Sequence, residues 1–156
     1  MSFLGNPPAP LASAEPAVEN DGWFPDIDLQ ALRNTVRLDG SVTPARLRHA
    51  VITAMLSVNG ELRDWQAGHI AAGIASLAQV PGPRVDGAHA AQARYLRAVY
   101  CAVRAELVET YRDFDTTGAG DKRAEPLENS AADLRRNMRW AISDLLGIRR
   151  TTVELI

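Results

Sequence analysis

The stretch from Asp113 to Gly118 carries the residue types that open a calcium-binding loop. Asp113, Asp115 and Thr117 alternate there, and Gly118 stands at the sixth place, where an EF-hand loop turns sharply. The twelfth place should supply a bidentate glutamate, but it holds Ala124, and no clear pair of EF-hand helices repeats elsewhere in the chain. The sequence therefore disfavours a calcium site. It favours the alternative that these aspartates cap a helix end and turn a loop.

Other residues that could do chemistry are scattered. His49, His69 and His89 form no HExxH motif and no i, i+4 pair, so they do not suggest a metal site. No serine or cysteine stands in a nucleophile elbow, and no glycine-rich loop with lysine resembles a phosphate cradle. The single cysteine, Cys101, excludes an intrachain disulfide and a zinc site built on several thiolates. We expect no catalytic residue, metal or cofactor, which argues against the hypothesis of a small enzyme.

Basic residues gather towards the end of the chain. They are Lys122, Arg123, Arg135, Arg136 and Arg139. Arg135 and Arg139 lie one turn apart on a predicted helix, so they could face phosphates together, and Lys122 and Arg123 add charge in the preceding loop. The alternative is a solvated helix face that Asp133 and Asp144 partly neutralise.

The composition limits the possible classes of protein. Nineteen acidic side chains against seventeen basic ones give a net charge of −2, whereas a dedicated nucleic-acid binder usually carries a basic excess. No run approaches the roughly 20 apolar residues that a membrane span needs. The first residues, 1–14, lack a basic start and are broken by prolines, so we expect no signal peptide and folding in a cytoplasm. A chain of 156 residues fits one domain.

Hydrophobic spacing predicts the elements that position these residues. We expect four helices, from Asp26 or Asp28 to about Leu38, from Thr43-Pro44 to about Gly73, from about Asp86 to Arg112, and from about Ser130 to Leu146. The second and third should pack antiparallel. The fold class is thus mainly α, a small bundle of about four helices with an extended N-terminal arm and a C-terminal β-strand tail. We divide the chain into an arm (1–25), a helical domain (26–147) and a tail (148–156).

The two ends of the chain differ from the helices. Residues 1–20 are rich in proline and alanine, and then Trp23, Phe24 and Pro25 follow in a stretch too broken to form a helix, so the two aromatic rings must bury against this subunit or a neighbour. The tail 151–156 alternates with period two and is β-branched, yet no partner strand is evident in the chain. We therefore expect it to pair with another protein or, alternatively, to fold back on its own helices.

Several phrases, in order along nearly the whole chain, resemble the head completion/stabilisation proteins of P2-like temperate phages. These phrases are Asn20-Asp21-Gly22-Trp23-Phe24-Pro25-Asp26-Ile27-Asp28, Leu47-Arg48-His49-Ala50, Tyr111-Arg112-Asp113-Phe114-Asp115-Thr116-Thr117 and Thr152-Val153-Glu154-Leu155-Ile156. They are much more specific together than one short motif. The start of the chain and the loop 118–126 are the parts that look variable.

The resemblance implies a structural virion protein and no enzyme. It implies attachment to the portal protein at the capsid vertex, a surface for neck or tail-terminator proteins, and a ring of about twelve copies around the packaged DNA. The portal or subunit interface of such an adaptor would then use Trp23, Phe24 and Pro25 together with Thr152, Val153, Glu154, Leu155 and Ile156. The resemblance also makes Lys122, Arg123, Arg135 and Arg139 candidates for lining the DNA channel. A DNA-binding helical module is the alternative function, which the acidic balance disfavours.

Overall fold

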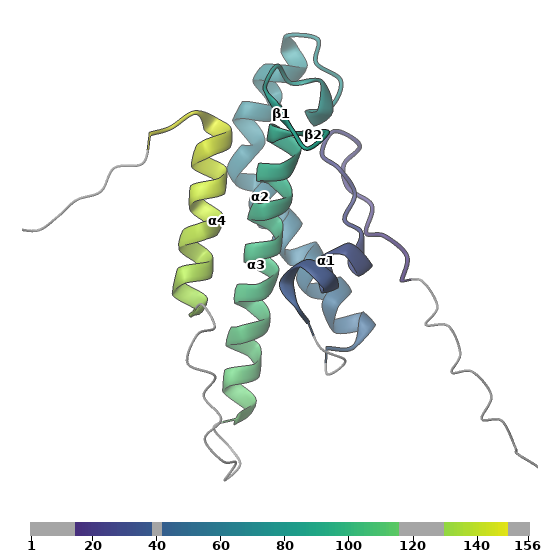
Figure 1. Ribbon diagram of the computed structural model, residues 1–156, viewed down its shortest axis with the longest axis vertical. Helices are drawn as coiled ribbons and strands as arrows, with labels where there is room; N and C mark the ends of the chain where they lie inside the picture. Colours follow the sequence, from purple (N-terminus) through teal and green to yellow (C-terminus); the bar gives the residue numbers. More distant parts are fainter. Residues whose placement is uncertain (1–14, 39–41, 116–129, 150–156) are drawn as a thin grey trace, which may run out of the picture.

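The computed structural model describes residues 15–38, 42–115 and 130–149 of the chain (Figure 1). Within these ranges the protein has four α-helices, a short 3-10 turn and one small hairpin, which confirms the predicted mainly helical fold. The elements are α1 (Leu29–Val36), α2 (Pro44–Ala71), η1 (Leu77–Gln79), β1 (Arg84–Val85), β2 (Ala88–His89), α3 (Ala90–Asp115) and α4 (Ala131–Leu146). None of the described helices has the length and hydrophobicity that crossing a bilayer requires.

Helix ends form where the sequence supplies caps. The Thr43 hydroxyl accepts a hydrogen bond from the N–H of Arg46 ahead of a proline at the first helical position, so α2 begins as predicted. Ser130 and Asp133 form a reciprocal capping box at the start of α4, and Gly147 ends that helix in the left-handed region at φ 70°. These local interactions set the boundaries that hydrophobic spacing alone leaves open.

The start of α3 differs from the prediction. Asp86 and Gly87 have φ values of 50° and 72° and form the turn of a two-stranded hairpin, in which Arg84 pairs with His89 and Val85 with Ala88. Two consecutive left-handed residues are typical of the turns that match the twist of a hairpin, and Asp-Gly is a preferred pair for them. The predicted helix start at Asp86 was therefore wrong, and α3 begins at Ala90 and continues to Asp115.

Helix α3 lies at the centre of the bundle. The long helices α2 and α3 run antiparallel, as predicted, and α4 returns along α3 (Figure 1). The apolar stripes predicted for α1, α2 and α4 face inward, with Leu32, Val58 and Ala141 fully buried. In its first turns and its middle, α3 also buries Tyr95, Ala98 and other residues. These buried side chains lie on several sides of the helix, so more than two neighbouring elements are needed to cover it.

An extended segment, residues 15–28, supplies part of that cover. Val18 and Ile27 form an antiparallel bridge with two backbone hydrogen bonds of 2.9 and 3.0 Å. At its start, the Glu15 carboxylate accepts bonds from both Nε and Nη2 of Arg33, and the same guanidinium donates to the Val42 carbonyl. Residues 15–25, which we assigned to an arm, are thus extended but packed on the helices, while residues 1–14 lie outside the described ranges.

Three polar side chains lock this segment to both long helices. Asn59 of α2 donates to the Asn20 Oδ1 at 2.9 Å, Asn20 donates to the Tyr95 hydroxyl at 2.8 Å, and Tyr95 donates back to the Asn59 Oδ1 at 2.7 Å. We call this closed ring of hydrogen bonds the polar clamp. Because each group has a partner, the three side chains can be partly buried without an unpaired donor or acceptor.

Replacing Tyr95 with phenylalanine should destabilise the protein. The change leaves the Asn59 Oδ1 without its donor, and a polar atom stranded in this way costs about 1–3 kcal/mol. We expect urea denaturation to show a loss of that size in the free energy of unfolding. Tyr100→Phe is the matched control, because the Tyr100 hydroxyl makes no hydrogen bond within the described residues and should lose less than about 0.5 kcal/mol. Equal losses in the two variants would contradict a stabilising clamp.

Alkaline pH should weaken the fold through the same residue. Burial raises the pKa of Tyr95 to about 12 from its ordinary value of 10.0. The unfolded chain therefore loses this proton first, so the stabilisation is complete below pH 10 and is lost as the pH rises towards about 12. The free energy of unfolding, measured across this window, should fall more steeply in the wild type than in Tyr95→Phe. Parallel curves would show that Tyr95 does not contribute.

Candidate interaction surfaces

Trp23 and Phe24 are buried within this chain's own core, with only 6% and 2% of their surface exposed. The Phe24 ring stacks on Tyr95 at a centroid distance of 4.6 Å, and the Trp23 ring meets Phe24 and Trp65 edge to face at 4.9 and 5.8 Å. The Trp23 Nε1–H donates to the Ile74 carbonyl at 3.0 Å, so the polar edge of the indole is satisfied too. The pair fills the space between α2, α3 and the turn that follows α2.

Asp21 shapes the turn that aims both rings inward. Its Oδ1 accepts from the backbone N–H groups of Trp23 and Phe24, each at 2.9 Å, and its Oδ2 accepts from the Gln66 amide at 2.8 Å. Burial raises the pKa of this carboxyl, but hydrogen bonds from Phe24, Gln66 and Trp23 outweigh burial and leave the pKa below its usual value. Gly22 sits in the same turn at φ 85°, where a side chain would be strained.

We expected a portal or subunit interface at Trp23, Phe24 and Pro25 because the two aromatic rings have to be buried against some protein surface. The subunit itself covers both rings, and Pro25 is half-buried beside them, so no partner is required to bury them. A further contact by this segment stays a prediction. The other interface residues, Thr152 to Ile156, lie outside the described ranges.

The arginines of α4 are engaged mainly with acids and an aromatic ring. Arg135 forms a bidentate ion pair with Glu109 of α3, and this hydrogen bonding raises the pKa of the guanidinium. Arg136 pairs with Asp133 at 2.8 Å and lies 5.1 Å from the centre of the Trp140 ring. Both arginines remain about half exposed, so these pairs contribute little to stability.

Those contacts bear on the possible DNA lining. Arg139 is exposed on α4 near Arg135, so the two side chains do share a region of the surface, but Arg135 already shares its charge with Glu109. Lys122 and Arg123 lie outside the described ranges. Of the proposed DNA-channel lining, the structure describes Arg135 and Arg139, and the pairing of Arg135 with Glu109 reduces the net positive charge of this surface. The contact with DNA stays a prediction.

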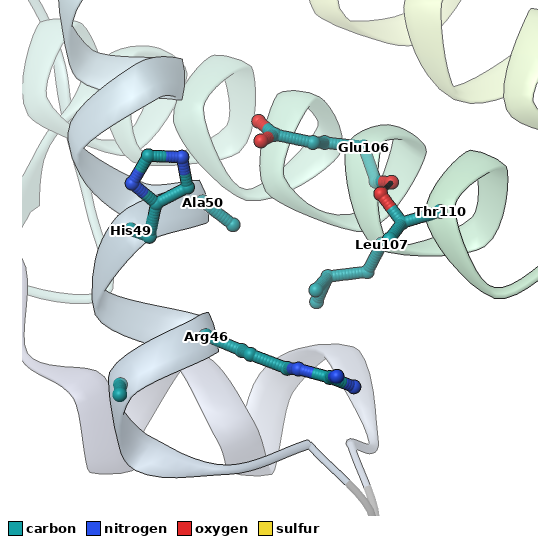
Figure 2. Close-up of a pocket in the computed structure, with 7 residues that line it drawn as sticks. Arg46, His49, Ala50, Glu106, Leu107 and Thr110 are labelled. Atoms are coloured by element: carbon teal, nitrogen blue, oxygen red, sulfur yellow. Dashed lines mark hydrogen bonds between the residues drawn. The ribbon is translucent and has the colours of Figure 1, made fainter.

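A groove of about 400 Å³ lies between the first half of α2 and the second half of α3. Figure 2 shows Arg46, His49 and Ala50 on one wall facing Glu106, Leu107 and Thr110 on the other. Ala50 and Leu107 are buried, whereas the charged side chains stand at the edges. Burial raises the pKa of Glu106, against the opposing effect of His49 and Arg135. Sequence patterns did not reveal this groove, because it depends on where two helices diverge.

No arrangement that could hold a metal is found among the described residues, searched for groups of three or more His, Cys, Asp and Glu side chains. The helix α3 runs through Asp113 and Asp115 of the calcium-like motif, and the rest of that motif lies outside the described ranges. The three histidines have different environments. His69 packs against Trp23 and Trp65, and His49 lines the groove. His89 is buried and accepts a hydrogen bond from the Ala91 N–H.

Comparison with known proteins identifies the family. Residues 18–156 match the family described as Phage head completion protein (GPL). The chain is also 40% identical over 145 residues to the Head completion/stabilization protein of Escherichia phage P2, covering 93% of this chain and 86% of that protein. No solved structure matches. The match includes Trp23, Phe24, the polar clamp and all four helices, so this chain belongs to the phage head completion protein family, a family of structural, non-enzymatic proteins of the phage head.

Proposed function

We propose that this head completion protein attaches to the portal protein at the vertex of the DNA-filled capsid and forms a ring of identical subunits there. The ring then offers a surface to neck or tail-terminator proteins. The observation that carries the proposal is the match to the P2 head completion/stabilization protein over almost the whole chain.

The fold suits an adaptor role. A ring requires a heterologous interface, in which each subunit presents two different surfaces to its neighbours. The bundle offers an elongated body with the α2–α3 groove on one side and the charged face of α4 elsewhere. The strand that the sequence predicts at 151–156 would add a second mode of contact, because an edge strand gains affinity from backbone hydrogen bonds and selects its partner through alternate side chains.

The proposed attachment can be tested with DNA-filled heads that lack this protein. The purified chain should bind such heads at a single vertex, and electron microscopy should show ring-shaped density there together with improved retention of DNA. A mass measurement of the complex gives the number of copies. Binding spread over the whole capsid surface, or no binding, would refute the portal assignment while leaving the family membership intact.

Deleting Thr152–Ile156 should abolish attachment to the vertex and leave the helical bundle intact. We expect helicity and the melting temperature to stay nearly unchanged, since the described core is complete without this segment. Circular dichroism and head binding measure the two effects separately, and Glu154→Gln serves as a control that keeps the strand pattern. A truncated protein that melts several degrees lower yet still binds would show instead that the tail folds back on its own helices.

Charge reversal of Arg135 and Arg139 should reduce DNA retention in filled heads if this face lines the exit channel. Each lost phosphate contact weakens the salt-dependent attraction to DNA. Because Arg135→Glu also breaks the Glu109 pair, Arg135→Gln with Arg139→Gln is the milder companion variant. The measurement is the fraction of heads that keep their DNA at increasing salt. Unchanged retention in both double variants would remove these arginines from the channel.

A further inference from the structure

One side of helix α3 is left uncovered by the other helices. In Figure 1, α2 lies behind α3 while α1 and α4 flank it, so no helix lies over the side that faces the viewer. Over the first half of α3 the exposed residues are Ala93, Arg94 and Arg97, and Arg104 follows two turns later, half-buried. Separations of three and seven residues return to the same side of a helix, so the three arginines share one side of α3 over about 15 Å. We call Arg94, Arg97 and Arg104 the arginine strip.

The surroundings of Cys101 place two of these guanidinium groups close together. Burial raises the pKa of the Cys101 thiol, while the charges of Arg97 and Arg104 and a hydrogen bond with the Arg97 side chain act to lower it. Both arginines therefore lie beside the same sulfur, one about a turn before it along α3 and the other about a turn after it. The arginine strip is thus a cluster of charges in space as well as a pattern in the sequence.

No acidic residue along this part of α3 neutralises the arginine strip. Between Asp86 and Glu106 the sequence contains no Asp or Glu, and this run includes all three arginines. Among the described residues, neither Arg94 nor Arg97 forms an ion pair. Their contrast with Arg135, which shares its charge with Glu109, is clear.

The acids beside α3 do not offset the strip either. Burial raises the pKa of Tyr100 and the nearby charge of Asp28 raises it further, so Asp28 lies on the α1 side of α3. Its carboxylate is engaged, because it caps α1 by accepting from two backbone N–H groups. Helix α1 contains no acid, and α4 contains Asp133, which pairs with Arg136, and Asp144. One remaining carboxylate against three arginines leaves the strip with a net positive charge.

A phosphate backbone is the partner that fits this surface. Guanidinium groups donate strong hydrogen bonds to phosphate oxygens, and such contacts do not depend on the base sequence. The centre of a protein interface instead buries aromatic and apolar side chains, and none of the large hydrophobic side chains that the described residues expose lies on α3. The strip is also a straight, uncovered ridge of about 15 Å, along which a duplex with one charge per about 1.7 Å presents several phosphates.

We propose that the arginine strip of α3 binds the phosphate backbone of double-stranded DNA without sequence preference. This surface differs from the Arg135 face, because Arg97 and Glu109, the partner of Arg135, are separated by about a third of a turn around α3. The contact is local, in keeping with a chain whose net charge is −2. The proposal goes beyond attachment to the head vertex and does not depend on it, since the purified protein carries the strip.

Matched double variants of the full chain test the strip. Arg94→Gln with Arg97→Gln removes two of its charges, and the control, Arg37→Gln with Arg63→Gln, removes two exposed arginines elsewhere that also form no ion pair among the described residues. Binding of a short labelled DNA duplex is measured between about 50 and 200 mM salt. Each lost phosphate contact reduces the slope of log affinity against log salt by about 0.9, so the strip variant should lose about 2 from the slope and about tenfold or more in affinity at about 50 mM salt. The control should change affinity less than about twofold, and Arg94→Lys with Arg97→Lys should retain binding. Circular dichroism confirms that each variant is folded.

Nuclear magnetic resonance of the isotope-labelled protein locates the contact. Adding the duplex should shift the backbone amide signals of Arg94 to Arg104, and shifts confined to α4 would overturn the proposal. Absence of wild-type binding at about 50 mM salt, or equal losses in the strip and control variants, would overturn it as well. Tighter binding of polyglutamate than of the duplex would make the strip a contact for an acidic protein and refute the assignment to DNA. None of these results bears on attachment to the vertex, which binding to DNA-filled heads tests separately.

Discussion

The need to cover α3 on nearly every side governs this fold. From Ala90 to Thr110 this helix leaves only a narrow exposed strip, at Ala93, Arg94 and Arg97 and again at its end. Two long neighbours, α2 and α4, cannot surround it, so α1 and the extended segment 15–28 close the remaining side. Extended backbone is acceptable in that position because the Val18–Ile27 bridge pairs backbone groups and because side chains of the segment bond others: Asp21 accepts from the N–H groups of Trp23 and Phe24, and Asn20 donates to the Pro25 carbonyl.

The aromatic residues connect this cover to the turn that follows α2. Phe24 lies on Tyr95, and Tyr95 belongs to the polar clamp, so the same residue anchors the segment through both its ring and its hydroxyl. Trp23 then reaches the turn after α2 and supports it through Ile74 and Leu77. The phrase from Asn20 to Asp28, which carried much of the family resemblance, therefore joins the extended segment to α2, to α3 and to the turn that follows α2.

Charge is distributed unevenly along the bundle. The Arg135–Glu109 pair and the polar edges of the groove carry charge, whereas residues 65–83 contain no Asp, Glu, Lys or Arg. The net charge of −2 for the whole chain hides this separation.

The sequence by itself determined the helices, since caps and apolar spacing act over one or two turns: Thr43-Pro44, Ser130 and Gly147 marked boundaries that the structure confirms. Asp86-Gly87 carried an equally local signal for a hairpin, but the helical spacing after it was extended too far. Family and structural role could also be predicted, from ordered phrases along the chain. The tertiary structure alone decided that Trp23 and Phe24 bury within the subunit, that Glu109 pairs with Arg135, and that a groove opens between α2 and α3. Each of these features depends on which residues, distant in the sequence, come into contact. The positions at which the helices cross determine these contacts, and no local periodicity encodes those positions.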